Sequence, residues 1–374
     1  KSLCVPEWIT RIGSSAFAGC ESLSDVKFTN AQVEIGAGAF SGCPLKELNL
    51  PEGIRYAGED FAFSGTDIAR LVLPDSVTSL AYGNFEDCSR LEKIDVPSSV
   101  MSVGGHAFDG TLWMNDQADG PLYINHIFLG YKRTMLADTA LCIREGTTVI
   151  ADFALEERSE LGTLVFPEGL KAIGAWALFN CSSLRELIIP ASVTTIDLSA
   201  FAGCSSLRAI RVSPDNPNYT SVDGVLFNKD GTELLWCPNR QESRYEVPDS
   251  VTRIATGAFS NSGVSSVRIT NPNIELGAYS VGYRSVGCYN AHDTDYFSED
   301  FGYGGYFDRI PTEIVCTEGS TAYAYAQENH MLITVPKQVV ASSDNGVVSV
   351  SGTTDSIADN VVVKAVEKPM NEMD

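Results

Sequence analysis

Hydrophobic and polar positions along the chain repeat with a period of about 23 residues. The clearest example is 167–212, where PEGLKAIGAWALFNCSSLRELII is followed by PASVTTIDLSAFAGCSSLRAIRV. Pro167 matches Pro190 and Cys181 matches Cys204 when the two lines are aligned. Self-similarity at a fixed period between 20 and 50 residues indicates a solenoid, and it outranks any local assignment of helix or strand.

An Ala-Phe step marks the successive turns of this solenoid. Its aromatic or leucine position falls at Phe17, Phe40, Phe63, Phe85, Phe108, Leu155, Leu178, Phe201 and Phe259. The intervals before Leu155 and before Phe259 are longer than one unit. We therefore expect extra sequence to enter as whole blocks between intact repeats, as loops on one face of the stack.

Each unit contains two short extended pieces. In 45–51, leucines alternate with polar residues before Pro51, which predicts a short strand ended by proline. A second extended piece follows, for example over 76–80, and then a helical turn carrying Ala-Phe-x-Gly-Cys. Because one unit cannot bury its own apolar residues, about three or more must stack to be stable.

The unit L-x-x-[IL]-x-[IL]-P-x-[SG]-[VIL]-x-x-I-G-x-x-A-F-x-G-C resembles the BspA-type leucine-rich repeat of bacterial surface proteins. The resemblance covers roughly 1–335 and implies a right-handed leucine-rich repeat solenoid. About ten turns of short parallel strands and short helical turns are expected. It also implies hairpin insertions near 213–247 and, more diverged, near 111–142. Secretion or attachment to the cell wall, with a role in adhesion or binding, is a further implication of this kinship.

The end of the chain departs from the period. A third insertion interrupts the last repeat near 282–309, and 319–330 resembles the helical terminal turn that covers the open end of such a stack. Beyond it, 336–374 has valine-rich runs separated by polar residues. This predicts a strand-rich C-terminal appendage or the start of a further module.

Composition narrows the classes of partner. The 374 residues carry a net charge of −22 and no basic cluster, which argues against nucleic acid and anionic membrane surfaces as partners. No run of 18 apolar residues is present, so no membrane insertion is expected. The chain opens on KSLCVPEW without an initiator methionine, so we expect a mature or trimmed product.

The ten cysteines fall into two groups. Cys20, Cys43, Cys88, Cys181 and Cys204 share one repeat position, so stacking predicts a buried column and not a tetrahedral zinc site. The other five are scattered, and one disulfide among them stays open: Cys4, Cys142, Cys237, Cys288 and Cys316.

Other candidate chemistry is sparse. His106 occupies a variable slot of its repeat, for which a solvated or edge position is expected, and no metalloprotease, nucleophile-elbow or phosphate-loop motif is present. Oxygen-bearing residues at 215–223 and 228–231 raise the question of calcium, but their Asp-Gly steps are better explained by hairpin turns. We therefore expect no enzyme activity, cofactor or metal.

Two surfaces are candidates for ligand binding. The first is the outward column of the strand layer, expected to be concave. Its proposed contact residues are Val72, Asp95, Val165, Ile188, Arg211 and Arg268. The second is the glycine-rich aromatic insertion, whose proposed contact residues are Tyr296, Phe301, Tyr303 and Tyr306. The alternative for these rings is packing against the end of the solenoid.

The sequence thus predicts a non-enzymatic surface or secreted scaffold. Its expected partner is a protein or glycan on a host or neighbouring cell. Two alternatives remain open: a spacer that presents another module from the cell wall, and the non-catalytic part of a larger enzyme.

Overall fold

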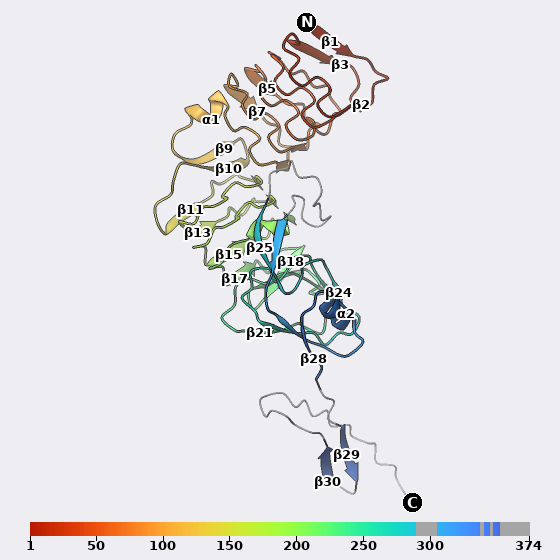
Figure 1. The fold of residues 1–374 in the computed structure, drawn as a ribbon. Helices are drawn as coiled ribbons and strands as arrows, with labels where there is room; N and C mark the ends of the chain where they lie inside the picture. Colours follow the sequence, from red (N-terminus) through yellow and green to blue (C-terminus); the bar gives the residue numbers. More distant parts are fainter. Residues whose placement is uncertain (289–304, 337–339, 345–346, 352–374) are drawn as a thin grey trace, which may run out of the picture.

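The computed structural model describes residues 1–288, 305–336, 340–344 and 347–351. Apart from the last two segments, these residues form a solenoid of about 13 turns, each contributing up to two short strands (Figure 1). Two strand layers run along its length, and within each layer parallel pairing between successive turns joins strands into several short sheets. The leucine-rich repeat solenoid expected from the sequence is confirmed.

The strands of the first layer are formed by the segment of each unit in which leucines alternate with polar residues. Its strands are β1 (Ser2–Val5), β3 (Asp25–Phe28), β5 (Arg70–Val72), β7 (Lys93–Asp95), β11 (Thr139–Cys142), β13 (Leu161–Val165), β15 (Glu186–Ile189), β17 (Ala209–Val212), β21 (Arg244–Glu246), β23 (Ser266–Arg268), β27 (Glu313–Val315) and β28 (Leu332–Thr334). Burial alternates along them, as in β3 and β15, so every second side chain enters the core.

The second layer consists mostly of strands of only two residues. They are β2 (Arg11–Ile12), β4 (Glu34–Ile35), β6 (Ser79–Leu80), β8 (Ser102–Val103), β12 (Val149–Ile150), β14 (Ala172–Ile173), β16 (Thr195–Ile196), β22 (Arg253–Ile254) and β24 (Glu275–Leu276). The second residue of each strand points inward, and in all but β24 it is buried.

Columns of identical side chains fill the space between the layers. The rings of Phe17, Phe40, Phe63, Phe85 and Phe108 stack nearly parallel, with centroids 5.3 to 5.9 Å apart. Burial of such rings is the main source of stability in a repeat stack, because each turn alone leaves them exposed.

The Ala-Phe step mostly lies in a non-helical turn, unlike the expected helical turn. A short 3-10 helix, η1 (Leu198–Phe201), forms at one such step. At most of the other steps the residue two before and the residue two after the phenylalanine position adopt positive φ, as at Gly38 (60°) and Gly42 (69°). Alternate N–H groups then face different ways: Ala39 donates to Gly36 within the turn, and Phe40 donates to Ala62 in the next turn. These bonds between turns replace the helix.

Two inserted hairpins join the second layer and do not remain outside it. One follows the short helix α1 (Leu112–Asp116) and pairs β9 (Gly120–Ile124) with β10 (Ile127–Lys132). The other pairs β18 (Tyr219–Val222) with β19 (Val225–Asn228), and β19 with β20 (Glu233–Trp236). Because β10 pairs parallel with β12, and β20 with β22, the expectation of loops on one face is wrong. Their apolar side chains are buried in the columns, which holds them in the stack.

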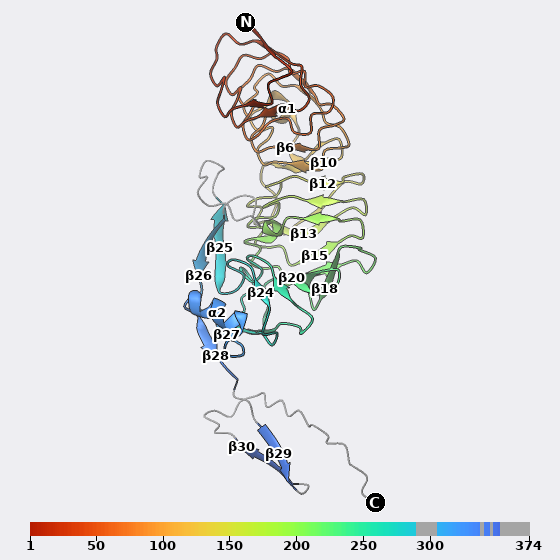
Figure 2. The same ribbon diagram turned by 90° about the vertical axis from the view of Figure 1, so that its right-hand side faces the viewer.

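The C-terminal end is covered by helix α2 (Thr321–Glu328), whose Ala322 and Ala326 are buried. A hairpin of β25 (Tyr283–Cys288) and β26 (Gly305–Arg309) lies along the side of the stack (Figure 2). A separate hairpin pairs β29 (Val340–Asp344) with β30 (Val347–Ser351). In the part of the chain that the structure describes, no helix is long and apolar enough to cross a membrane.

Candidate binding surface

The six strand residues predicted to form a binding face lie on outward positions of the first layer. Val72, Asp95, Val165, Ile188, Arg211 and Arg268 lie on β5, β7, β13, β15, β17 and β23, respectively. The parallel register places Val72 opposite Asp95 and Ile188 opposite Arg211. Strand pairing along the column is interrupted between β7 and β11 and between β17 and β21, where the inserted segments enter, and also between β3 and β5 and between β13 and β15.

An uncharged patch crosses β11, β13 and β15. Ala140, Cys142, Thr163, Val165 and Ile188 are all exposed there, with Val165 49% and Ile188 61% accessible. The pairing of β11 with β13 places Ala140 opposite Thr163 and Cys142 opposite Val165, and β15 of the next turn contacts β13 without pairing with it. We call this set the central patch. Adjoining exposed aliphatic side chains are a typical feature of surfaces that other proteins cover.

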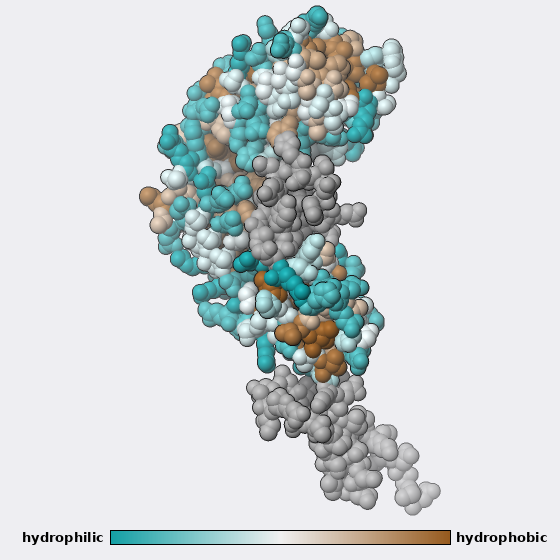
Figure 3. Space-filling view, viewed as in Figure 1, coloured by the Kyte–Doolittle hydropathy of each residue, from teal (hydrophilic) through white to brown (hydrophobic). Residues whose placement is uncertain are grey.

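Charged groups border the central patch. The Arg211 guanidinium donates to the Glu186 carboxylate, and Arg185 Nη1 lies 3.0 Å from Asp138 Oδ1. An apolar centre with a polar rim is the usual layout of a protein interface. Hydrophilic and intermediate residues cover most of the face seen in Figure 3, which also shows separate apolar areas near the N-terminal end and near α2 and β28.

The predicted arginines have partners within the chain. Arg211 pairs with Glu186 of the neighbouring strand, and Arg268 Nε lies 3.4 Å from Glu246 Oε1 across the same kind of strand pair. Exposed pairs of this type contribute about 0–1 kcal/mol to stability. The arginines thus link turns, and an incoming ligand would have to compete with these partners.

Val72 lines a separate shallow depression at the start of the face. Asn49, Arg70 and Asp75 line it too, and its volume is about 510 Å³. The depression lies where the first layer has only an isolated bridge between Lys27 and Asn49 in place of a full strand pair. On the next strand, Oδ1 of Asp95 lies 3.5 Å from the side-chain amide nitrogen of Asn125.

The strand face is convex, contrary to the expected concave face. In Figure 1 the labelled first-layer strands from β5 to β17 follow the outer side of the bend. A strand face becomes concave when wider helices occupy the opposite side, since a helix is about 10 Å across and strands are about 4.8 Å apart. Here the opposite side is again extended chain, so that cause is missing.

Most of the predicted aromatic surface lies outside the described residues. Tyr296, Phe301 and Tyr303 belong to 289–304, so their role stays a prediction. Tyr306 lies on β26, where its backbone pairs with Gly287 of β25.

The repeated cysteines form a buried column. Cys43, Cys88, Cys181 and Cys204 are buried, whereas Cys20 in the first turn is exposed. Each buried thiol donates to a backbone carbonyl of the preceding turn, at 3.0 to 3.2 Å. The nine cysteines whose side chains the structure describes are free thiols, and the side chain of Cys288 is not among them. The packing interpretation of the column is therefore confirmed.

His106 is half-buried, which agrees with the edge position and not with the solvated one of the two that were expected. Its Nδ1 lies 2.7 Å from Asp109 Oδ2, and its ring meets the edge of Tyr82 at 5.2 Å. The hydrogen bond to Asp109 raises the pKa of His106 above its ordinary value. Within the described ranges, no group of three His, Cys, Asp or Glu side chains could hold a metal ion.

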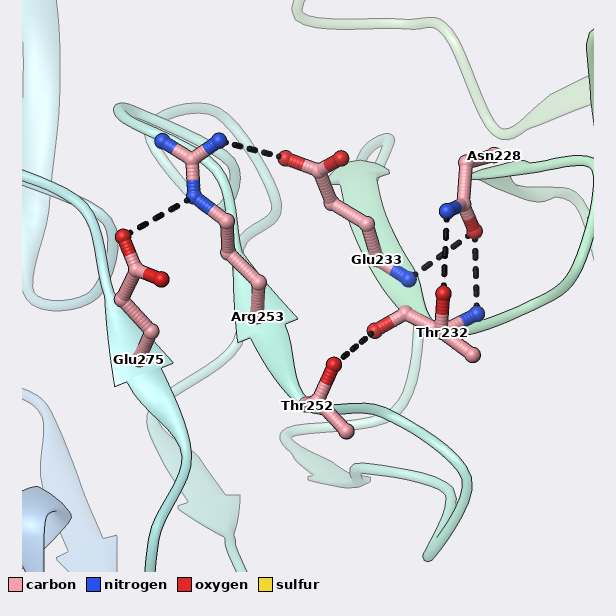
Figure 4. Close-up of polar contacts among 6 residues, drawn as sticks. All are labelled: Asn228, Thr232, Glu233, Thr252, Arg253 and Glu275. Atoms are coloured by element: carbon pink, nitrogen blue, oxygen red, sulfur yellow. Dashed lines mark hydrogen bonds and ion pairs between the residues drawn. The ribbon is translucent and has the colours of Figure 1, made fainter.

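The residues considered for calcium build hairpin turns. Asp223 and Gly224 both have positive φ, as a tight turn between β18 and β19 requires. Asn228 Oδ1 accepts from the backbone N–H groups of Thr232 and Glu233, each at 2.9 Å (Figure 4). This oxygen is therefore already engaged in the turn.

Sequence reasoning missed a groove on the second layer, beside Tyr56. It has a volume of about 940 Å³ and lies between the second and fourth turns. A signal was present in the spacing: Pro51 and Phe63 are 12 residues apart, whereas Pro74 and Phe85 are 11 apart. The extra residue is Gly58.

Comparison with known proteins agrees with the fold. A family model described as BspA type Leucine rich repeat region matches 1–115, 137–233 and 237–286. Among curated proteins, none matches the chain significantly.

Several solved structures resemble the chain. A leucine rich cell surface protein from Faecalibacterium prausnitzii A2-165 is 24% identical over 74% of this chain and 65% of its own, with a TM-score of 0.35. A leucine-rich repeat protein from Eubacterium ventriosum is 24% identical over 56% of each chain, with a TM-score of 0.32. The pneumococcal vaccine antigen PcpA is 16% identical over 90% of this chain and 89% of its own, with a TM-score of 0.28. The chain thus spans less than two thirds of the length of the first two structures.

Proposed function

The chain belongs to the BspA-type leucine-rich repeat family, and from this premise we propose that it is a non-enzymatic scaffold that binds a protein through the convex face of its first strand layer. The central patch carries the proposal: Cys142, Val165 and Ile188 are exposed on three adjoining strands. As part of the same proposal, we place the protein at the cell surface or in the secreted state.

The chemistry of the patch favours a protein over a glycan. Its side chains are aliphatic or small, whereas sugar rings bind best to aromatic faces and to clustered hydrogen-bonding groups. The Arg211–Glu186 and Arg185–Asp138 pairs give the patch a polar rim. Truncating an aliphatic residue at the centre of an interface typically costs more affinity than changing a rim charge.

Binding to an array of extracellular proteins and to a glycan array tests this function. Any protein bound should then be measured against Val165→Asp and Ile188→Asp, which we expect to weaken its affinity at least tenfold. The matched control is Val222→Asp, because Val222 is 51% exposed but lies on the β18–β19 hairpin.

Equal losses in all three variants, or binding that none of them alters, would remove the central patch from the function. Failure to bind any protein would favour the spacer instead. Binding confined to the glycan array would shift the search to the aromatic insertion.

A further inference from the structure

The groove beside Tyr56 is formed by an irregular third turn. In the second layer β2 pairs with β4 and β6 pairs with β8, but the third turn between them has only an isolated bridge from Tyr56 to Ser79. Gly58 is the additional residue, and its φ of 117° is one that other residues rarely adopt. The ladder opens at this point, and the groove occupies the opening.

A small core residue deepens the opening. The inward position of the second layer is held by Ile12, Ile35, Leu80 and Val103 in the neighbouring turns and by Ala57 in the third turn. Ala57 is fully buried and much shorter than its counterparts, so less side-chain volume fills the core at the third turn. The volume of about 940 Å³ is at the upper end of the range of ligand sites.

Among small and aliphatic residues, the lining of the groove contains one aromatic ring and three carboxylates. Tyr56 exposes 63% of its surface, and Glu34, Glu59 and Asp60 supply three carboxylates. Arg55 also lines the groove. An accessible tyrosine ring beside carboxylates suits a guanidinium or ammonium group, which can stack on the ring while its N–H groups bond the acids.

The carboxylates are only loosely engaged by Arg11. The Arg11 guanidinium lies 3.9 Å from Glu34 and 3.8 Å from Glu59, beyond hydrogen-bond distance, and both acids expose more than half of their side chains. Glu59 Oε2 also accepts from the Ala37 N–H at 3.1 Å, which fixes its position at the groove.

The equivalent arrangement near the other end of the stack is closed. There Arg253 Nη1 lies 2.9 Å from Glu233 Oε1 and Arg253 Nε lies 3.3 Å from Glu275 Oε1 (Figure 4). The backbone of Glu233 is itself held by Asn228. Arg11 and Glu34 share the outward register of the second layer with Glu233, Arg253 and Glu275, whereas Glu59 lies three residues beyond Tyr56, which holds that position in the third turn. Arg253 links its turns through close contacts with Glu233 and Glu275, whereas Glu34 and Glu59 remain accessible beside the groove.

We propose that the groove beside Tyr56 is a second binding site, specific for a basic segment of a polypeptide. An arginine or lysine side chain of the partner stacks on the Tyr56 ring and bonds Glu34 and Glu59. The net charge of −22 attracts such a segment from a distance. This site is independent of the central patch, which lies on the other strand layer.

Calorimetric titration with a capped hexa-arginine peptide tests the proposal, with hexa-glutamate as the matched probe. We expect hexa-arginine alone to bind, and its affinity to fall as salt rises from 50 to 500 mM. Glu34→Gln with Glu59→Gln should weaken binding about tenfold, and Tyr56→Ala about three- to fivefold. Tyr56→Phe should retain wild-type affinity, because the ring is kept.

The control is Glu233→Gln with Glu275→Gln, which removes the same charge from the closed trio. We expect it to change the affinity less than twofold, with the fold of every variant checked by circular dichroism. Equal losses from the two double variants would show attraction to the overall charge and overturn the site. So would no binding at 50 mM salt, or a neutral oligosaccharide that binds through Tyr56 without salt dependence.

Discussion

The Sγ of Cys181 lies 3.1 Å from the backbone carbonyl oxygen of Leu155, to which its thiol donates a hydrogen bond. The two residues belong to successive turns, and Leu155 occupies the phenylalanine position of the earlier turn. Cys204 bonds Leu178 in the same way, at 3.1 Å. The repeated cysteine therefore links turns as well as filling space, which a small apolar residue would not do.

Replacing Cys181 by alanine should lower the free energy of unfolding by about 1–3 kcal/mol, because a buried hydrogen bond and a buried sulfur are lost together. The measurement is urea denaturation followed by circular dichroism. The control is Cys20→Ala at the same repeat position, where the thiol is exposed and the change should stay within about 0.5 kcal/mol. Equal effects at the two positions would contradict the linking role of the thiol.

The column should also make the protein sensitive to alkali. Burial raises the pKa of the Cys181 thiol from an ordinary value of 9.0 to about 12. Above pH 9 the unfolded chain loses this proton while the folded chain keeps it, so stability falls as the pH rises from 9 to 12. Thermal midpoints measured across this range should decrease, and the slope should be smaller in Cys181→Ala.

Alkylation provides a second readout of the same column. At pH 8 iodoacetamide should modify the exposed thiols of Cys4, Cys20 and Cys142, and should spare Cys181 and Cys204 until urea is added. Peptide mass spectrometry identifies the modified sites. Rapid labelling of Cys181 in the folded protein would contradict its burial.

Close approach of successive turns should make one glycine position intolerant of a side chain. A Cβ added at Gly104 would lie 2.4 Å from the Tyr82 backbone nitrogen, so Gly104→Ala should destabilise the protein by about 1–3 kcal/mol. Gly13 occupies the same repeat position in the first turn and has open space around it. Gly13→Ala is therefore the matched control in a thermal unfolding experiment, and we expect it to be near neutral.

Much of the fold could be predicted from spacing alone. The phenylalanine and cysteine columns follow from the period, because residues one turn apart must stack when the turns are equal in length. The helical turn could not be ruled out in this way. The non-helical turn that forms instead depends on positive φ at positions such as Phe61 and Trp176. The sequence pattern does not indicate these values, since bulky residues rarely adopt that conformation.

The candidate sites were less accessible to sequence reasoning. The outward positions of Val165 and Ile188 follow from strand alternation, but the adjacency of Val165 to Cys142 depends on the pairing of β13 with β11, the strand that follows the inserted hairpin. The groove beside Tyr56 was missed because a single additional residue, Gly58, leaves the repeat pattern of the sequence almost unchanged. Only the backbone shows that it opens the ladder of the second layer.

The sequence by itself determined the repeat, its family and the identity of the core columns, because a fixed period leaves stacking as the way to bury the apolar positions. The tertiary structure decided which side of the bend the strand face occupies, that the hairpins enter the stack, and where the ladder is broken. These features depend on how successive turns pair and rotate against one another. Their cause is the sum of many backbone hydrogen bonds between turns, which no single unit of the sequence contains.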